Sequence, residues 1–191
     1  MNTPGHYILN LALLGKTISP QHHLAIAIGA ILPDLPIFLC YFVAKFVYQL
    51  PENKIWSEVY YEPGWQNLVA LFHSIPLALM GAAIFYRLDS QPGIILCLSL
   101  VCHSLLDLPV HHDDAHRHFF PLTNYRWISP FSYWDTNHYG KTVALIEMFL
   151  VLGVNPLVFS WLHSPWTKGI VIAIDLFYLL GYYRFYLSKL I

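Results

Sequence analysis

The feature that most constrains the fold is the recurrence of long apolar runs along the chain. Four runs are close to the ~20 residues that a helix needs to cross the hydrocarbon core of a bilayer. They are residues 68–86, 93–110, 143–163 and 169–187. A fifth stretch is divided into residues 24–33 and 35–44, with Asp34 between them. The sequence predicts an all-α, integral-membrane helical bundle of about four to five spans, in which the first span is broken or consists of two half-helices.

Composition supports a membrane protein over the alternative, a compact helical protein with a very apolar core. Charged residues make up 11% of the chain, whereas soluble domains contain about 25%. The 191 residues fit one domain, 1–191, with polar connections at 51–66 and 111–141. Lysines and arginines are scattered singly and the net charge is -1, so no nucleic-acid partner is expected.

Several of the apolar runs contain an ionisable residue, which is costly in lipid unless it has a partner. Such residues are therefore candidates for a functional site. They are His73, His103, Asp107, Glu147 and Asp175. Glu147 and Asp175 stand alone or near the end of a run, and a role in helix packing or snorkelling is equally expected for them.

The spacing of His103 and Asp107 is typical of a chelating pair. Positions i and i+4 lie on one helix face, so both side chains can reach one ion, although the same spacing also suits an ordinary hydrogen bond. Asp34 at a helix break and His73 in an apolar helix add ligands from two further helices, with His6 as a weaker fourth contributor. Ligands from several helices are what a metal site in a bundle core requires.

The ordered motifs TPGHYILN, GAILPDLP, FHS and CHSLLD resemble those of the membrane-bound metal-dependent hydrolases, an inner-membrane family of unknown function. The resemblance covers about residues 3–120 and extends more distantly to the zinc-dependent phospholipase C group. It implies a helical hydrolase in a bacterial inner (plasma) membrane. It also implies metal ligation by His6, Asp34, His73, His103 and Asp107. The chain departs from the family pattern after Asp34, where Leu35 and Pro36 follow instead of a second acid and a histidine.

The segment HHDDAHRHFFPLTNYR follows the HxxxD helix and is predicted to lie at the mouth of the site. His111 or His112 is a candidate ligand of a second ion bridged by Asp107, and we assign His112 to the metal site. Asp113 or Asp114 is expected to take the proton from a metal-bound water. Three further side chains are candidates to bind a substrate phosphate: Arg117, His118 and Arg126. The alternative is a solvated loop whose charges neutralise one another.

Mixed nitrogen and carboxylate donors favour zinc as the cofactor, and manganese or iron also fits such donors. The three cysteines lie in apolar runs, which is typical of small core residues. The prediction is a hydrolase in which a metal-activated water attacks an ester, with Asp107 contributing the negative charge that balances the ion. A phosphoester of a lipid-like or small molecule is the favoured substrate, and membrane lipid the expected surroundings.

Three rival functions stay open. The first is a non-enzymatic membrane protein that binds or transports a metal ion. The second is an enzyme of cofactor biosynthesis, although no GxxxxGK[ST] motif supports ATP use. The third is a bis-histidine haem protein, which the accompanying aspartates disfavour.

Overall fold

The computed structural model describes residues 1–16, 18 and 20–188. Over this part of the chain the fold is all-helical and no β-strand occurs. The α-helices are α1 (Thr3–Leu14), α2 (His23–Ile31), α3 (Leu35–Phe42), α4 (Glu52–Ser57), α5 (Pro63–Phe72), α6 (Ile75–Arg87), α7 (Gln91–Asp107), α8 (Gly140–Trp161) and α9 (Pro165–Tyr182). Short 3-10 or π turns are η1 (Pro20–His22), η2 (Leu32–Asp34), η3 (Val43–Val47), η4 (Val59–Tyr61), η5 (Thr136–His138) and η6 (Tyr183–Leu187).

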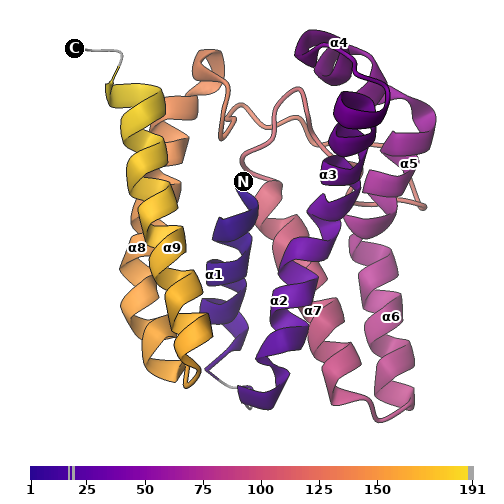
Figure 1. The fold of residues 1–191 in the computed structure, drawn as a ribbon. Helices are drawn as coiled ribbons and strands as arrows, with labels where there is room; N and C mark the ends of the chain where they lie inside the picture. The colour runs from indigo at the N-terminus through magenta and orange to yellow at the C-terminus, as the bar shows by residue number, and fades with distance from the viewer. Residues whose placement is uncertain (17, 19, 189–191) are drawn as a thin grey trace.

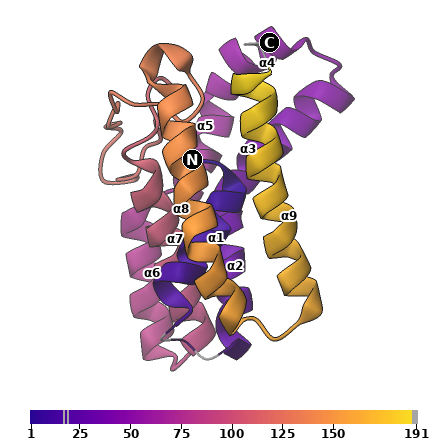
Figure 2. The same cartoon turned by 90° about the vertical axis from the view of Figure 1, so that its left-hand side faces the viewer.

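The long helices run side by side, and α1 lies in the middle of them (Figures 1 and 2). Helix α6 packs along α7, and α7 packs on α2. Helix α1 contacts both α2 and α8, and α8 pairs with α9. The two halves of the bundle therefore meet across α1, and buried side chains such as Ile8, Ile26, Val151 and Val171 form the core between them.

Proline marks the beginning of most of these helices. A proline stands at the first or second position of α1, α3, α5, α6, α7 and α9. Proline is favoured there because its missing N–H would have no partner in the first turn of a helix. At the start of α6, the Ser74 side chain also accepts a hydrogen bond of 3.1 Å from the backbone N–H of Leu77.

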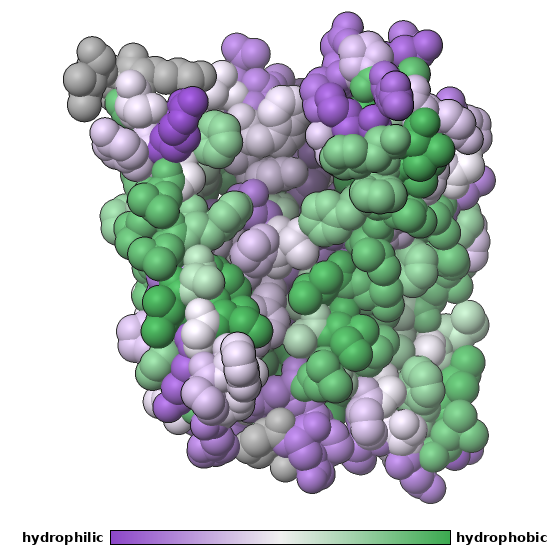
Figure 3. All heavy atoms as spheres, in the orientation of Figure 1, coloured by the Kyte–Doolittle hydropathy of each residue, from purple (hydrophilic) through white to green (hydrophobic). Residues whose placement is uncertain are grey.

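Three helical segments are long and apolar enough to cross a membrane, namely His23–Val47, Gly140–Trp161 and Pro165–Leu187. The first joins α2, η2, α3 and η3 into 25 residues, so the divided first span is one helical segment with a 3-10 turn at Asp34. Figure 3 shows two hydrophobic areas on the viewed side, over α9 and over α2 and α3, separated by a hollow with more hydrophilic residues, and further hydrophilic residues at the two ends of the bundle.

The two remaining predicted spans differ from simple membrane helices. Residues 68–86 fall on α5 and α6, which meet at an angle of 45° at His73 and Ser74. Neither helix alone is long enough to cross a membrane, but the two together are. Helix α7 has 17 residues and ends at Asp107. The described residues thus contain three helical segments that could span a membrane, or four if the bent pair counts as one span. The prediction was four to five spans.

Polar side chains connect the buried faces of the helices. Asn10 on α1 donates from Nδ2 to the carbonyl oxygen and the hydroxyl of Ser99 on α7, each at 2.8 Å. The Ser99 hydroxyl donates in turn to the carbonyl oxygen of Ile26 on α2 at 2.7 Å. These bonds satisfy groups that are fully buried, and they set the relative position of α1, α2 and α7.

Glu147 and Asp175, the two acids of the last spans, make hydrogen bonds to neighbouring elements, which agrees with a role in helix packing. Glu147 accepts hydrogen bonds from the Tyr178 hydroxyl at 2.6 Å and from the Asn2 backbone at 2.9 Å. Asp175 accepts a short hydrogen bond from Asn155. Both acids therefore join α9 to α8 or α8 to the start of α1.

Candidate metal centre

Histidines and aspartates from four parts of the chain meet between α1, α2 and α7. His6 comes from α1, Asp34 from η2, His73 from the bend between α5 and α6, and His103 and Asp107 from the last two turns of α7. His6, His73 and His103 are fully buried, and 1% of Asp107 is exposed. Such a concentration of buried ionisable groups requires strong partners.

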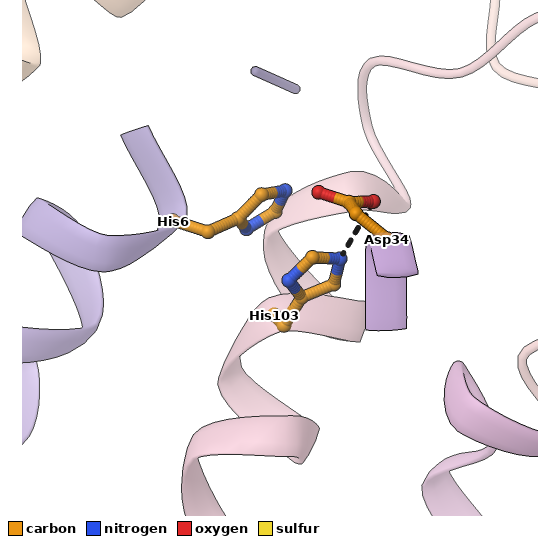
Figure 4. A group of neighbouring side chains, drawn as sticks. All are labelled: His6, Asp34 and His103. Atoms are coloured by element: carbon orange, nitrogen blue, oxygen red, sulfur yellow. Dashed lines mark ion pairs between the residues drawn. The ribbon is translucent and has the colours of Figure 1, made fainter. Parts of the chain in front are cut away.

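Two groups of three residues have the spacing of metal ligands. The first is His6, Asp34 and His103, and the second is His73, Asp107 and His116. Within each group, one ligand atom per residue lies within 4.8 Å of the other two. Figure 4 shows the side chains of the first group pointing toward one another from three different elements, with an ion pair of 3.6 Å between His103 Nε2 and Asp34 Oδ1.

Backbone carbonyl groups fix the orientation of two of the imidazole rings. The Nδ1–H of His103 donates to the carbonyl oxygen of Ala30 at 2.8 Å, and that of His73 donates to the carbonyl oxygen of Val69 at 2.9 Å. Each ring therefore keeps the lone pair of Nε2 for another partner. A histidine that ligates a metal almost always has this kind of support on its other ring nitrogen.

The free ring nitrogens face the two aspartates. His103 Nε2 lies 3.1 Å from Asp107 Oδ2, and His73 Nε2 lies 3.6 Å from the same oxygen and 3.8 Å from Asp34 Oδ1. His6 Nε2 lies 2.9 Å from Asp107 Oδ1. The two ligand groups are thus adjacent, and Asp107 lies between them.

Several polar atoms of this cluster have no hydrogen-bond partner among the described residues. They are His6 Nδ1, His73 Nε2, His103 Nε2, Asp107 Oδ2 and His116 Nε2. An unsatisfied buried polar group costs about 1–3 kcal/mol. A divalent ion between these atoms would satisfy them, because imidazole nitrogen and carboxylate oxygen are both donors that such ions accept. The residues therefore fit a metal ion.

The loop after α7 contributes further side chains to the cluster. His111 Nε2 lies 3.1 Å from Asp107 Oδ1, and its Nδ1 lies 3.0 Å from Asp114 Oδ2. The ring of His116 lies 4.1 Å from that of His73, between their centroids. The Met1 amino group donates to Asp107 Oδ1 at 2.6 Å and lies 2.9 Å from His111 Nε2.

Burial disfavours the charged form of two loop histidines, His116 and His118. It lowers the pKa of His116 well below its usual range, and the neighbouring His73 and His111 lower it further. Burial also lowers the pKa of His118 to about 4. Both rings are therefore neutral at neutral pH, which is the form that can ligate a metal. Burial acts against the charge of Asp114 as well, yet pairing with His111 holds the pKa of this carboxyl below its usual range.

The structure separates the residues predicted from the loop into two sets. His111 joins the cluster, whereas His112 donates from Nδ1 to the Ser129 carbonyl oxygen at 2.6 Å and stacks on His138 at 3.6 Å. His112 belongs to neither ligand group. Asp114 lies beside His111, and Asp113 is exposed. His116, which was not among the predicted ligands, belongs to the second group. Its position in the histidine-rich segment after α7 is the sequence feature that points to it as a ligand.

The predicted phosphate-binding residues are also divided. Arg117 donates from Nη2 to the Gln66 carbonyl oxygen at 2.6 Å and to Asn67 Oδ1 at 2.8 Å. Arg126 donates to Gln66 Oε1 at 2.8 Å. Both guanidinium groups are therefore held at α5. His118 is buried, and its ring lies 5.8 Å from that of His116.

A cavity of about 670 Å³ opens onto the cluster. Asp34, His111 and His116 line it, as do Asp113 and Asp114. Much of its lining is aromatic, namely Phe38, Tyr41, Trp56, Tyr60, Tyr61, Tyr133 and Trp134. Among the described residues that line this cavity there is no lysine or arginine. A small organic group can therefore reach the ligand cluster through a largely apolar entrance.

No family model, no curated protein and no solved structure matches the chain. The resemblance to the membrane-bound metal-dependent hydrolases, drawn from the motifs around His6, Asp34, His73 and His103, stays a prediction. The candidate site accordingly depends on its geometry, in which five of the six predicted metal ligands fall in the two ligand groups.

Proposed function

We propose that this protein is a membrane-bound, metal-dependent hydrolase that cleaves an ester. The observation that carries the proposal is the pair of buried His and Asp groups, whose free ligand atoms meet beside a cavity. Three helices with the length and apolar character of membrane spans support the location in a membrane. A bacterial inner membrane is the location implied by the motif resemblance.

Zinc is the metal that we propose, with manganese or iron as alternatives. The six residues of the two groups provide four imidazole and two carboxylate ligands, and none of the described cysteines belongs to either group. Such an ion supplies a Lewis acid that lowers the pKa of a water from 15.7 to about 7. Asp107, whose two oxygens face ligands of both groups, balances its positive charge.

Asp114 is the residue that we propose as general base. It lines the cavity, and its carboxylate lies 3.0 Å from His111 Nδ1 and accepts a hydrogen bond of 3.2 Å from Trp134 Nε1. These partners keep it ionised, and an ionised carboxylate can accept a proton. Asp113 lines the same cavity but is exposed, and it is the alternative.

A phosphoester is the substrate class that we favour. Neither lysine nor arginine is among the described residues that line the cavity, so the negative charge of a phosphate would be met by the metal centre and by the Met1 amino group, which lines the cavity beside His111. Arg117 and Arg126 would have to leave Gln66 and Asn67 to approach it. His118 is buried, with its ring centroid 5.8 Å from that of His116, and it is the predicted phosphate-binding residue that contacts a candidate ligand.

Elemental analysis and a hydrolysis screen of the detergent-purified protein test this function. Generic phosphomonoester, phosphodiester and carboxylester substrates are assayed with added zinc or manganese, for the wild type and for Asp107→Asn. We expect bound metal and metal-dependent hydrolysis that the substitution abolishes. The rival, a protein that binds or transports metal, predicts bound metal and movement of the ion into vesicles with no hydrolysis of any substrate class.

A further inference from the structure

A second cavity lies on the side of α9 and adjoins the aromatic cavity at Thr3. It has a volume of about 660 Å³ and lies between α1, α2, α9 and the turn before α9. Thr3 lines both this cavity and the aromatic cavity described above. The Thr3 hydroxyl also donates to Asp34 Oδ2 at 2.6 Å, so the second cavity begins directly beside a candidate metal ligand.

The walls of this second cavity are apolar. Ala27 and Ile31 of α2 face Ile170 and Ile174 of α9 across it, and Tyr7 of α1 contributes to its lining. No acidic residue, lysine or arginine occurs among the described residues that line it. Its polar residues other than Thr3 and Tyr7 are Gln21, His23, His163, Ser164 and Thr167, near the start of α2 and of α9. The walls that α2 and α9 form beyond these polar residues are apolar, and they can cover a hydrocarbon chain.

The direction of the cavity matches that of a lipid chain in a bilayer. Its two side walls belong to His23–Val47 and Pro165–Leu187, both long and apolar enough to span a membrane. Between Thr167 and Ile174 it follows α9 for on the order of 10 Å, at 1.5 Å per residue. Figure 3 shows a hollow between the hydrophobic surfaces of α9 and of α2 and α3, and Figure 1 shows α1 behind it.

We propose that this cavity is a chain-binding groove, and that the substrate is a single- or double-chain amphiphile whose ester lies at the metal centre. The inference rests on the proposed hydrolase function and narrows its substrate to a membrane lipid. The polar end occupies the cavity in front of Asp34 and His116, and one hydrocarbon chain lies along α2 and α9. The two cavities adjoin at Thr3, and this selects a lipid as the occupant, because a lipid has a polar end for the first cavity and a hydrocarbon chain for the second.

Photolabelling tests the groove without requiring turnover. The probe is hexadecyl phosphate with a diazirine near the end of its chain, added to the full-length protein in nanodiscs. We expect saturable labelling of residues 24–31 and 165–174, displaced by unlabelled hexadecyl phosphate and not by butyl phosphate. Non-saturable labelling spread evenly over the outer faces of α6, α8 and α9 would overturn the proposal, as would labelling confined to a co-purified protein.

Bulky substitutions then test the position of the chain. Ala27→Trp fills the groove from α2, and Ile170→Trp, at a side chain that is 49% exposed, fills it from α9 if the first variant does not fold. Each is expected to lower saturable labelling, and the ratio of hexadecyl to butyl ester hydrolysis, by about tenfold, because several methylene groups lose their burial. Ala83→Trp adds the same bulk on the exposed face of α6 and should change neither value.

The two readouts separate the groove from the catalytic proposal. Saturable groove labelling without hydrolysis of any ester supports the groove and rejects the hydrolase. Hydrolysis with equal rates for hexadecyl and butyl esters in both the wild type and Ala27→Trp supports the hydrolase and rejects the groove.

Discussion

At the scale of single residues, His103 has the most complete support of any candidate ligand. Its Nδ1–H is held by the Ala30 carbonyl oxygen, and its Nε2 faces Asp34 and Asp107. We expect His103→Ala to lower the affinity for zinc by at least about 10–100-fold, since even loss of a supporting group costs that much. Titration of metal-depleted protein with zinc measures this. His112→Ala, next to the cluster but outside both ligand groups, serves as the control and should retain the wild-type affinity.

Asp114 allows a separate test of chemistry at the residue scale. Asp114→Asn keeps the size of the side chain and removes its basicity, so turnover should fall by about 10²–10⁴-fold. Metal content should stay at the wild-type level, because Asp114 belongs to neither ligand group. Parallel kinetics and elemental analysis check both statements. Wild-type turnover in this variant would move the assignment to Asp113, the other acid that lines the cavity.

At the scale of elements, the site depends on close packing of α2 against α7. A Cβ added at Gly29 would lie 2.5 Å from the Leu96 carbonyl oxygen and 2.6 Å from Ser99 Cβ. We expect Gly29→Ala to destabilise the protein by about 1–3 kcal/mol, because backbone atoms of the two helices would have to separate. Unfolding in mixed micelles measures the change.

The same packing should transmit the substitution to the metal site. Asp34 lies at the end of the segment that begins with α2, and His103 lies on α7, so separating the helices moves one ligand from the other. Gly29→Ala is therefore expected to weaken zinc binding as well. Gly153→Ala on α8 is the matched control, since a Cβ there meets nothing within 4 Å. Equal stability of the two variants would mean that α2 and α7 tolerate a wider spacing.

At the scale of the whole molecule, many large apolar side chains are exposed on the helices. Helix α9 exposes large side chains such as Leu180 at 64% and Phe177 at 52%, and α3 exposes Phe38 and Phe42. We expect the protein to stay in the membrane fraction after washing with carbonate at high pH, because the apolar segments need hydrocarbon around them. Fractionation followed by immunoblotting checks this, and recovery as a monomer without detergent would contradict it.

Metal removal should also act on the whole molecule. An ion bound only by the folded state stabilises it by mass action, with about 2.7 kcal/mol expected at a concentration 100 times the dissociation constant. Candidate ligands from α1, η2, α7 and the following loop meet at the site, so an ion bound there would join elements far apart in the sequence. Chelation should therefore lower the Tm of the wild type, and it should lower that of His103→Ala by less, because this variant binds the ion more weakly. A Tm that is insensitive to chelators in both proteins would indicate that no metal contributes to stability.

Much of this protein could be predicted from the sequence because the decisive patterns are local. Apolar runs of membrane length predict helices irrespective of which elements pack against them. A proline at the start of a run marks where its helix begins. The i and i+4 spacing of His103 and Asp107 places both on one helix face by the geometry of the helix alone. The structure confirms the helical fold. It also brings Asp34, His73 and His6 close to His103 and Asp107.

Only the tertiary structure decided how the loop after α7 meets the site. The backbone of this loop is held by long-range bonds, from Ser129 N–H to the His111 carbonyl oxygen at 3.0 Å and from Tyr133 N–H to that of Val110 at 3.0 Å. These bonds turn His111 toward Asp107 and His112 toward Ser129. The sequence alone does not distinguish these two adjacent histidines, because the backbone that carries them is held by Ser129 and Tyr133, which lie much later in the chain.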